Sequence, residues 1–131
     1  MNILLVCKLS DQTLEENVLL PLLSCNLVDT VYLLRDSPTS FHCSRMHSIV
    51  VKRRKGWGRH ILKFFMGKRV VHDKNIGAIV GVLNTPHGFI GRTISLVTRV
   101  PYIHMTIAGH REFWRGGFLF EKLNFQLQLI E

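Results

Sequence analysis

The chain has 131 residues, of which 47% are hydrophobic, and this excludes a disordered chain and suits one folded domain with a core of its own. The formal net charge is +8, but it is divided unevenly: residues 1–44 carry five acidic and two basic side chains, and the remainder carries four and fifteen. A basic half of this kind indicates a polyanionic neighbour, whether nucleic acid, an anionic membrane face or a phosphorylated substrate.

The ends and the cysteines of the chain predict its compartment. No apolar run reaches the roughly 20 residues of a membrane-spanning helix, and Met1 leads into Ile3–Val6 without the basic region that opens a signal peptide. Three widely spaced cysteines suit a reducing compartment, with Cys7 expected as a buried free thiol. We therefore expect a cytoplasmic protein.

Three apolar runs predict strands in the first half of the chain. They lie at residues 2–7, within 29–36 and at 47–51, and the first is expected at the centre of the sheet. Between the first two, a helix is predicted that Ser10 or Asp11 caps and that Pro21 bends or shortens. Its apolar face comprises Leu14, Val18, Leu19 and Leu22.

Residues 52–69 carry eight of the seventeen basic side chains. Trp57, Ile61, Phe64 and Phe65 form an apolar stripe at helical spacing, and Arg59 and Lys63 fall away from that stripe. A basic amphipathic helix with tryptophan at its start is typical of a membrane interface, whereas a stripe that packs on the sheet is the competing interpretation. The candidate membrane-binding residues are Lys52, Arg53, Arg54, Lys55, Trp57, Arg59, Lys63 and Phe64.

Residues 76–107 read as a strand, a helix and a second strand. The apolar runs 76–83 and 101–107 have the β-branched composition of buried parallel strands, and 89–99 places Ile90, Ile94 and Val97 on one helical face. The predicted fold class is therefore α/β, a three-layer, doubly wound and mainly parallel sheet of Rossmann-like type. A linker is expected at 70–75 and a further apolar helix at 118–130.

The candidate site lies where the two central strands end, because ligands of open α/β sheets bind at the carboxyl ends of the strands. His87, at the mouth of this crevice and just before a helix, is a candidate acid/base group or a hydrogen-bond donor to a sugar hydroxyl. His104 lies inside the second strand and is expected as a buried or half-buried residue whose polar atoms have partners. The candidate substrate-binding residues are Asn84, Thr85, Gly88, Gly109, His110, Arg111 and Glu112.

Other common chemistries find no support in the sequence. The spacing of His87, His104 and His110 does not favour a metal site. The glycine-rich fingerprints of dinucleotide-binding and P-loop proteins are missing, as is the nucleophile elbow of α/β-hydrolases.

The chain resembles the N-terminal domain of family-4 type glycosyltransferases, retaining enzymes of the two-domain GT-B architecture. The likeness lies in the first strand, Met-Asn-Ile-Leu-Leu-Val, in the turn Pro86-His87-Gly88 and in the stretch 100–109, which is similar to the family's K-P-Y-V…T-V-H-G. Gly88, Gly109 and His87 match family positions. Val80, Val82 and Ala108 stand where the family usually has histidine.

This resemblance implies the acceptor-binding half of an enzyme that uses a nucleotide-sugar donor, with His87 as catalytic residue and a sugar or lipid-linked acceptor. The donor-binding C-terminal domain would be absent from residues 1–131, so we expect no activity from this chain alone and a peripheral place on the inner membrane face. The alternative is a non-enzymatic basic α/β module that binds a protein partner or nucleic acid through residues 52–69. No reader motif for nucleic acid is present.

Overall fold

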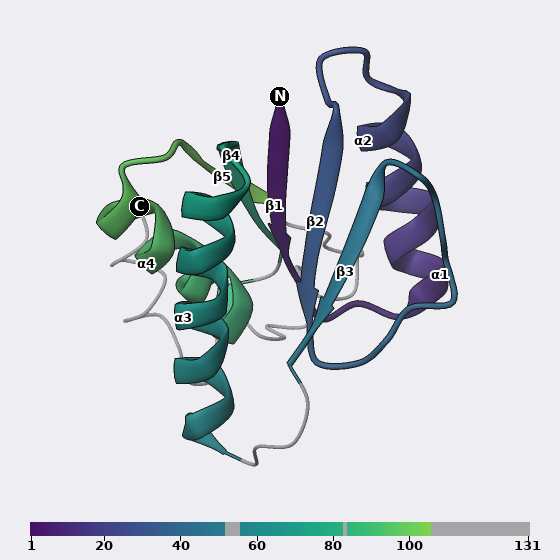
Figure 1. Ribbon diagram of the computed structural model, residues 1–131. Coiled ribbons are helices and arrows are strands. Elements are labelled where there is room, and N and C mark those ends of the chain that lie inside the picture. The colour runs from purple at the N-terminus through teal and green to yellow at the C-terminus, as the bar shows by residue number, and fades with distance from the viewer. Residues whose placement is uncertain (52–55, 83, 106–131) are drawn as a thin grey trace, which may run out of the picture.

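The computed structural model describes residues 1–51, 56–82 and 84–105. Five strands within these residues form one all-parallel sheet, which confirms the predicted Rossmann-like α/β class (Figure 1). The strand order is β3-β2-β1-β4-β5, with β1 at the centre as expected. The strands are β1 (Asn2–Val6), β2 (Thr30–Arg35), β3 (Met46–Val50), β4 (Ile76–Val82) and β5 (Tyr102–Met105).

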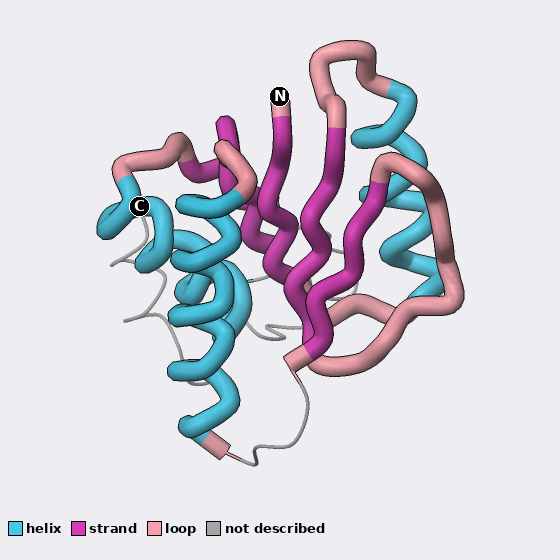
Figure 2. The backbone as a smooth tube through the Cα atoms, viewed as in Figure 1, coloured by secondary structure: helices cyan, strands magenta, loops and turns pink. Residues whose placement is uncertain are grey.

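Helices cover both faces of the sheet. Figure 2 shows the two helical layers on either side of the strands, with the first helix on one face and the two later helices together on the other. None of the helices that the structure describes is long and apolar enough to cross a membrane. The helical segments are α1 (Asp11–Leu14), η1 (Glu15–Leu19), α2 (Leu20–Ser24), α3 (Trp57–Asp73), η2 (Asn84–Gly88) and α4 (Phe89–Thr98).

The core is divided between the two faces of the sheet because successive strand residues point to opposite sides. Ile3 and Leu5 of β1 belong to the cluster under α1 and α2, whereas Leu4 and Val6 belong to the cluster under α3 and α4. Both faces of β1 are therefore apolar, which explains its continuous hydrophobic run. Cys7 is buried as predicted, and burial raises the pKa of its thiol to about 11.

The first helical layer matches its prediction closely. Ser10 is the cap, and its hydroxyl accepts a hydrogen bond from the Thr13 backbone N–H at 3.3 Å. Pro21 does not end the helix; a π-helical turn, η1, stands just before it, and the chain stays helical to Ser24. Leu14, Val18 and Leu19 are buried, and Leu22 packs at the margin of the core.

Two predictions about the second helical layer are wrong. Val97 of α4 is exposed, whereas Ser95 is buried and donates a hydrogen bond to the Val100 carbonyl at 2.7 Å. The serine can face inward because this bond satisfies its hydroxyl. The expected linker 70–75 is mostly helix, because α3 continues to Asp73.

Arg45, just before β3, ties three segments together. Its guanidinium donates to the backbone carbonyls of Leu23, Cys25, Val28 and Asp29, at the end of α2 and in the chain that leads to β2. Its own carbonyl accepts from the Val31 N–H at 2.9 Å. The guanidinium therefore supplies donors to carbonyls that a helix end leaves without partners.

Candidate functional site

The carboxyl ends of the parallel strands meet at one edge of the sheet, where α3 and η2 also begin (Figure 1). The strand order reverses between β1 and β4, so the chain leaves these two neighbouring strands toward opposite sides. Residues 7–10 follow β1, and η2 follows β4 almost directly. This is the place where open α/β sheets hold their ligands.

Asp36, Lys63 and His87 come together at this edge. The Lys63 ammonium Nζ lies 2.8 Å from Asp36 Oδ1 and 3.0 Å from His87 Nδ1. Lys63 is 0% exposed and His87 2% exposed, and Asp36 is also largely covered. We call these three side chains the Asp36–Lys63–His87 cluster.

Each member of the cluster is placed by a different element. Asp36 follows the last residue of β2, His87 lies within η2, and Lys63 reaches the edge from the second turn of α3. Lys63 follows Asp36 by 27 positions in the chain, and His87 follows Lys63 by 24 and Asp36 by 51. The three side chains meet only because the strands are parallel and end together. A buried charge is tolerated when it is paired, and Lys63 has both an acidic and an imidazole partner.

The charges in the cluster shift one another's protonation. Burial works against a charged Asp36, but the Lys63 ammonium and, behind it, Arg59 hold the pKa of this carboxyl below its usual value. Burial lowers the pKa of Lys63, and Asp36 opposes that effect. Burial, followed by the positive charge of Lys63, lowers the pKa of His87 to about 3, so that its imidazole is neutral at physiological pH.

Arg59 and His60 stand at the margin of the cluster. Arg59 Nε lies 3.7 Å from Asp36 Oδ1, and the rings of His60 and His87 are 6.3 Å apart at an interplanar angle of 70°. Burial, Lys63 and Arg59 lower the pKa of His60. Among the described residues, the buried Nδ1 of His60 and Oδ2 of Asp36 have no hydrogen-bond partner. The edge therefore holds enclosed polar atoms whose hydrogen-bonding capacity is not used among the described residues.

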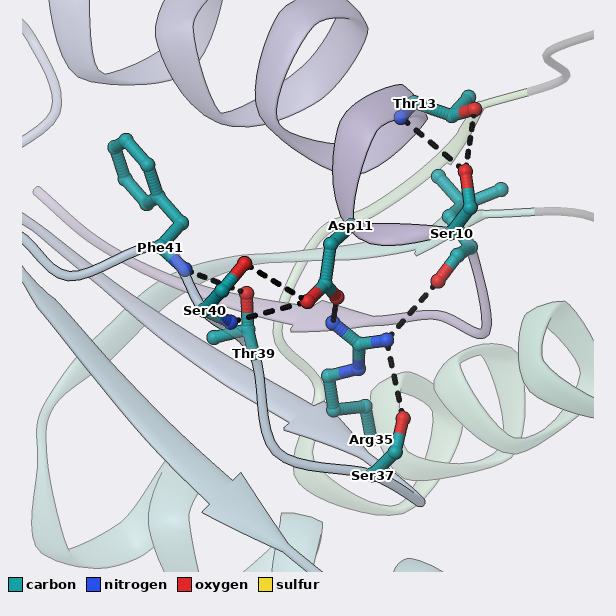
Figure 3. A network of polar contacts seen from close by, with 9 residues as sticks. Ser10, Asp11, Thr13, Arg35, Ser37, Thr39, Ser40 and Phe41 are labelled. Atoms are coloured by element: carbon teal, nitrogen blue, oxygen red, sulfur yellow. Dashed lines mark hydrogen bonds and ion pairs between the residues drawn. The ribbon is translucent and has the colours of Figure 1, made fainter.

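A second polar network holds the loops after β1 and β2 against each other (Figure 3). Arg35, the buried last residue of β2, donates to Asp11 Oδ1 at 2.7 Å and to the Leu9 carbonyl at 3.0 Å. Asp11 Oδ2 accepts from both the N–H and the hydroxyl of Ser40 at 3.0 Å. These bonds, with the Ser40 N–H first, lower the pKa of Asp11. The network fixes the loop from which Asp36 projects.

The β5 side of the site is held by Tyr102. Its hydroxyl donates to the Gly88 carbonyl at 2.9 Å, and His104 Nδ1 lies 3.1 Å from the same hydroxyl. A Cβ at Gly81 of β4 would overlap this hydroxyl, so only glycine fits beneath it. His104 is half-buried with a polar partner, as predicted. η2 is thus anchored from the neighbouring strand.

A separate open cavity of about 360 Å³ lies between α4 and the start of β5. None of the residues that line this cavity belongs to the Asp36–Lys63–His87 cluster. The lining residues are Arg92, Ser95, Leu96, Arg99, Val100, Pro101 and Tyr102.

Helix α3 packs on the sheet through a face other than the predicted stripe. Trp57, Ile61 and Phe65 are 84%, 57% and 59% exposed, so this part of the predicted stripe does not pack on the sheet. Lys63, predicted to contact a membrane, is instead fully buried, and Phe64 packs partly on the core. The face of α3 that packs inward carries Lys63, Gly67 and Val71, and Lys63 lies in it because Asp36 and His87 pair with its ammonium.

Other candidate residues fall in different parts of the chain. Asn84, Thr85 and Gly88 were predicted in a loop after β4, but they belong to the π-helical turn η2. Lys52–Lys55, the loop residues Gly109, His110, Arg111 and Glu112, and the predicted helix 118–130 lie outside the described residues. Asp36 was not among the predicted site residues, although a carboxylate directly after a buried strand is a usable signal for a site at the sheet edge.

Comparisons with protein-family models, with curated proteins and with solved structures found no match to this chain.

Proposed function

We propose that this chain is the acceptor-binding half of a retaining glycosyltransferase that takes sugar from a nucleotide-sugar donor. The observation that carries the proposal is the position of His87. It lies at the edge between β1 and β4, where the strand order reverses, and the buried ion pair of Lys63 and Asp36 holds it there. A rigidly held imidazole at such an edge suits recognition of a sugar hydroxyl.

The groups at this edge suit the acceptor better than the nucleotide diphosphate of the donor. Among the described residues it offers hydrogen-bonding groups and positive charges, including Lys8, Arg59 and His60, and no glycine-rich phosphate loop follows β1. The leaving nucleotide diphosphate would be stabilised by a second, donor-binding domain facing this edge. The acceptor would sit against η2, with His87 on its side of the site.

The outer face of α3 supports a place at an anionic membrane surface. Trp57, Ile61 and Phe65 present apolar side chains at i, i+4 and i+8. Basic residues flank this stripe in the sequence at 52–55 and at Lys68 and Arg69. A helix of this kind lies in the membrane interface and is drawn there by anionic lipid. An acceptor carried on a lipid would then be delivered to the edge of the sheet that α3 borders.

The direct test is transfer of labelled sugar from a set of nucleotide sugars to free and lipid-linked sugar acceptors. The full chain is assayed alone and together with a nucleotide-sugar-binding domain encoded in the same or an adjacent reading frame. We expect transfer only in the combined sample. His87→Ala should lower the rate at least tenfold, since one well-oriented hydrogen bond to a reacting group contributes about 1.5–3 kcal/mol.

The matched control is His72→Ala, because His72 is an exposed histidine at the far end of α3. It should leave transfer unchanged. Circular dichroism and the urea midpoint show whether either variant is folded. A folded His87→Ala protein with the full rate would remove His87 from the site, and no transfer with any donor domain would overturn the proposal.

The alternative, a binding module without enzymatic activity, makes a different prediction. Nucleic-acid binding through residues 52–69 would weaken steeply with salt, with a slope set by the number of phosphates that are neutralised. The inward position of Lys63 and its pairing with Asp36 reduce the charge that this segment offers to a polyanion. Tight, salt-sensitive binding to duplex or single-stranded nucleic acid, without sugar transfer, would favour the module.

A further inference from the structure

We propose that Lys63 is a positioning residue that holds His87 as a neutral imidazole with its proton on Nε2. The inference rests on the proposed function for its use in catalysis, but the protonation of the ring is an independent property of the cluster. It follows from which atoms face each other, and it decides which of two roles His87 can have.

The ammonium of Lys63 and the imidazole of His87 meet through one atom of each. Lys63 Nζ lies 3.0 Å from His87 Nδ1, within hydrogen-bond distance. A lysine ammonium has only donors, so the ring nitrogen that it contacts must be the acceptor and must lack a proton. In a neutral imidazole the proton is then on Nε2.

The charge of Lys63 decides the direction of this hydrogen bond. An amine without a proton could accept a hydrogen bond from Nδ1 and reverse the tautomer. Asp36 Oδ1 lies 2.8 Å from the same Nζ, and at this distance a carboxylate strongly favours the ammonium. Asp36 thus fixes the charge of Lys63, and Lys63 fixes the ring of His87.

The groups around His87 also decide whether its ring carries a charge. The groups that face His87 are Lys63 and His60 of α3, Lys8 after β1 and, as the acid, Asp36. Asp36 is already paired with Lys63 and has Arg59 at 3.7 Å. An imidazolium in this buried place would meet an adjacent ammonium without a carboxylate of its own. The neutral form is therefore favoured.

This tautomer decides between the two roles that the sequence left open for His87, an acid/base group or a hydrogen-bond donor to a sugar hydroxyl. With Nδ1 engaged and a proton on Nε2, the ring has no free lone pair and cannot take a proton from an acceptor hydroxyl. It can donate one hydrogen bond to an acceptor oxygen. His87 then orients the acceptor and is not the general base.

The test is long-range ¹H–¹⁵N NMR of the full chain with ¹⁵N-labelled histidine at pH 7.5, a method that distinguishes the two tautomers and the imidazolium. The His87 signals are assigned by their loss in His87→Gln. We expect an unprotonated Nδ1 and a protonated Nε2. A wild-type ring protonated on Nδ1, or on both nitrogens, overturns the proposal.

Variants at Lys63 test the cause. Lys63→Arg keeps a donor-only side chain and should retain the Nε2–H form, whereas Lys63→Met should give a mixture in which each tautomer exceeds one tenth of the population. Lys68→Met, at an exposed position of the same helix, is the matched control and should change nothing. A folded Lys63→Met protein that keeps the wild-type tautomer would show that Lys63 does not set it.

Acceptor binding separates this inference from the proposed function. The amide nitrogen of His87→Gln can replace an Nε2–H donor, so binding of the acceptor should fall less than threefold, against tenfold or more in His87→Ala. A large loss in both variants contradicts the donor role. If the tautomer is as expected but neither variant alters binding or transfer, the use of His87 in the proposed function fails and the positioning by Lys63 stands.

Discussion

Lys63 is buried because two partners share its ammonium group. Removing a charge from water is costly, and only close pairing with good geometry offsets that penalty. Asp36 Oδ1 at 2.8 Å and His87 Nδ1 at 3.0 Å provide the pairing. A buried ammonium is tolerated inside a protein only while its partners remain. Removal of one partner therefore costs more free energy than the intact cluster contributes to stability.

Asp36→Asn should therefore be strongly destabilising. The variant leaves the Lys63 ammonium buried without its carboxylate, and breaking a buried pair in this way costs about 3–5 kcal/mol. Urea denaturation at pH 7.5 measures the change in unfolding free energy. The control is Asp73→Asn, which removes an ion pair with Arg69 on the exposed side of α3 and should change the unfolding free energy far less. Equal effects of the two variants would contradict a buried, charged Lys63.

At the scale of the element, α3 shows the limit of prediction from hydrophobic pattern. The spacing of Trp57, Ile61 and Phe65 correctly indicates a helix, but these side chains form its exposed side. The face that meets the sheet carries Lys63, and its burial depends on Asp36, after β2, and on His87 of η2, which are distant in the sequence. α4 shows the same effect on a smaller scale, where a backbone carbonyl allows Ser95 to turn inward and Val97 remains outside.

The exposed stripe of α3 predicts binding to anionic vesicles. The double variant Trp57→Ser, Phe65→Ser should bind phosphatidylglycerol-containing vesicles at least tenfold more weakly, since burial of one such side chain contributes about 1.5–3 kcal/mol. Co-sedimentation is the measurement. The control Leu27→Ser changes an equally exposed apolar side chain in the chain between α2 and β2 and should have no effect. Unchanged binding of the double variant, or equal binding to neutral phosphatidylcholine vesicles, would contradict membrane docking by α3.

At the scale of the whole molecule, stability should fall as the pH falls from 6.5. The folded state lowers the pKa of His87 to about 3, so the unfolded chain, with an ordinary value near 6.5, binds the proton first. Acid therefore favours unfolding throughout this window, at up to about 1.4 kcal/mol per pH unit for one histidine. The lowered pKa of His60 also reduces the free energy of unfolding as the pH falls. The lowered pKa of Asp36 reduces it further once the pH falls below the usual carboxyl value.

Urea midpoints of the wild-type chain between pH 7.5 and 4 measure this dependence. His87→Gln, which cannot titrate, should lose most of the slope between pH 6.5 and 4, while His72→Ala should keep it, because His72 is exposed. A wild-type chain with a flat profile over that range would contradict a neutral, buried His87.

The sequence predicted the parallel sheet because the relevant signals are local. Continuous apolar runs such as Ile3–Val6 and Ile76–Val82 identify strands that are buried on both faces, and Ser10 identifies the start of a helix. The site was predicted only in part. His87 was found from its turn and its place before a helix, but its partners are 24 and 51 positions away, and no local pattern pairs them.

The side chain of Arg45 has a wider consequence for how the molecule opens. One guanidinium serves four carbonyls on the segment from Leu23 to Asp29, while its own backbone holds the Val31 amide. Lysine, with a single compact ammonium, has no fork with which to span them. The end of α2 and the beginnings of β2 and β3 are thus joined through a single side chain, so the loss of this guanidinium would leave all three segments without a shared partner.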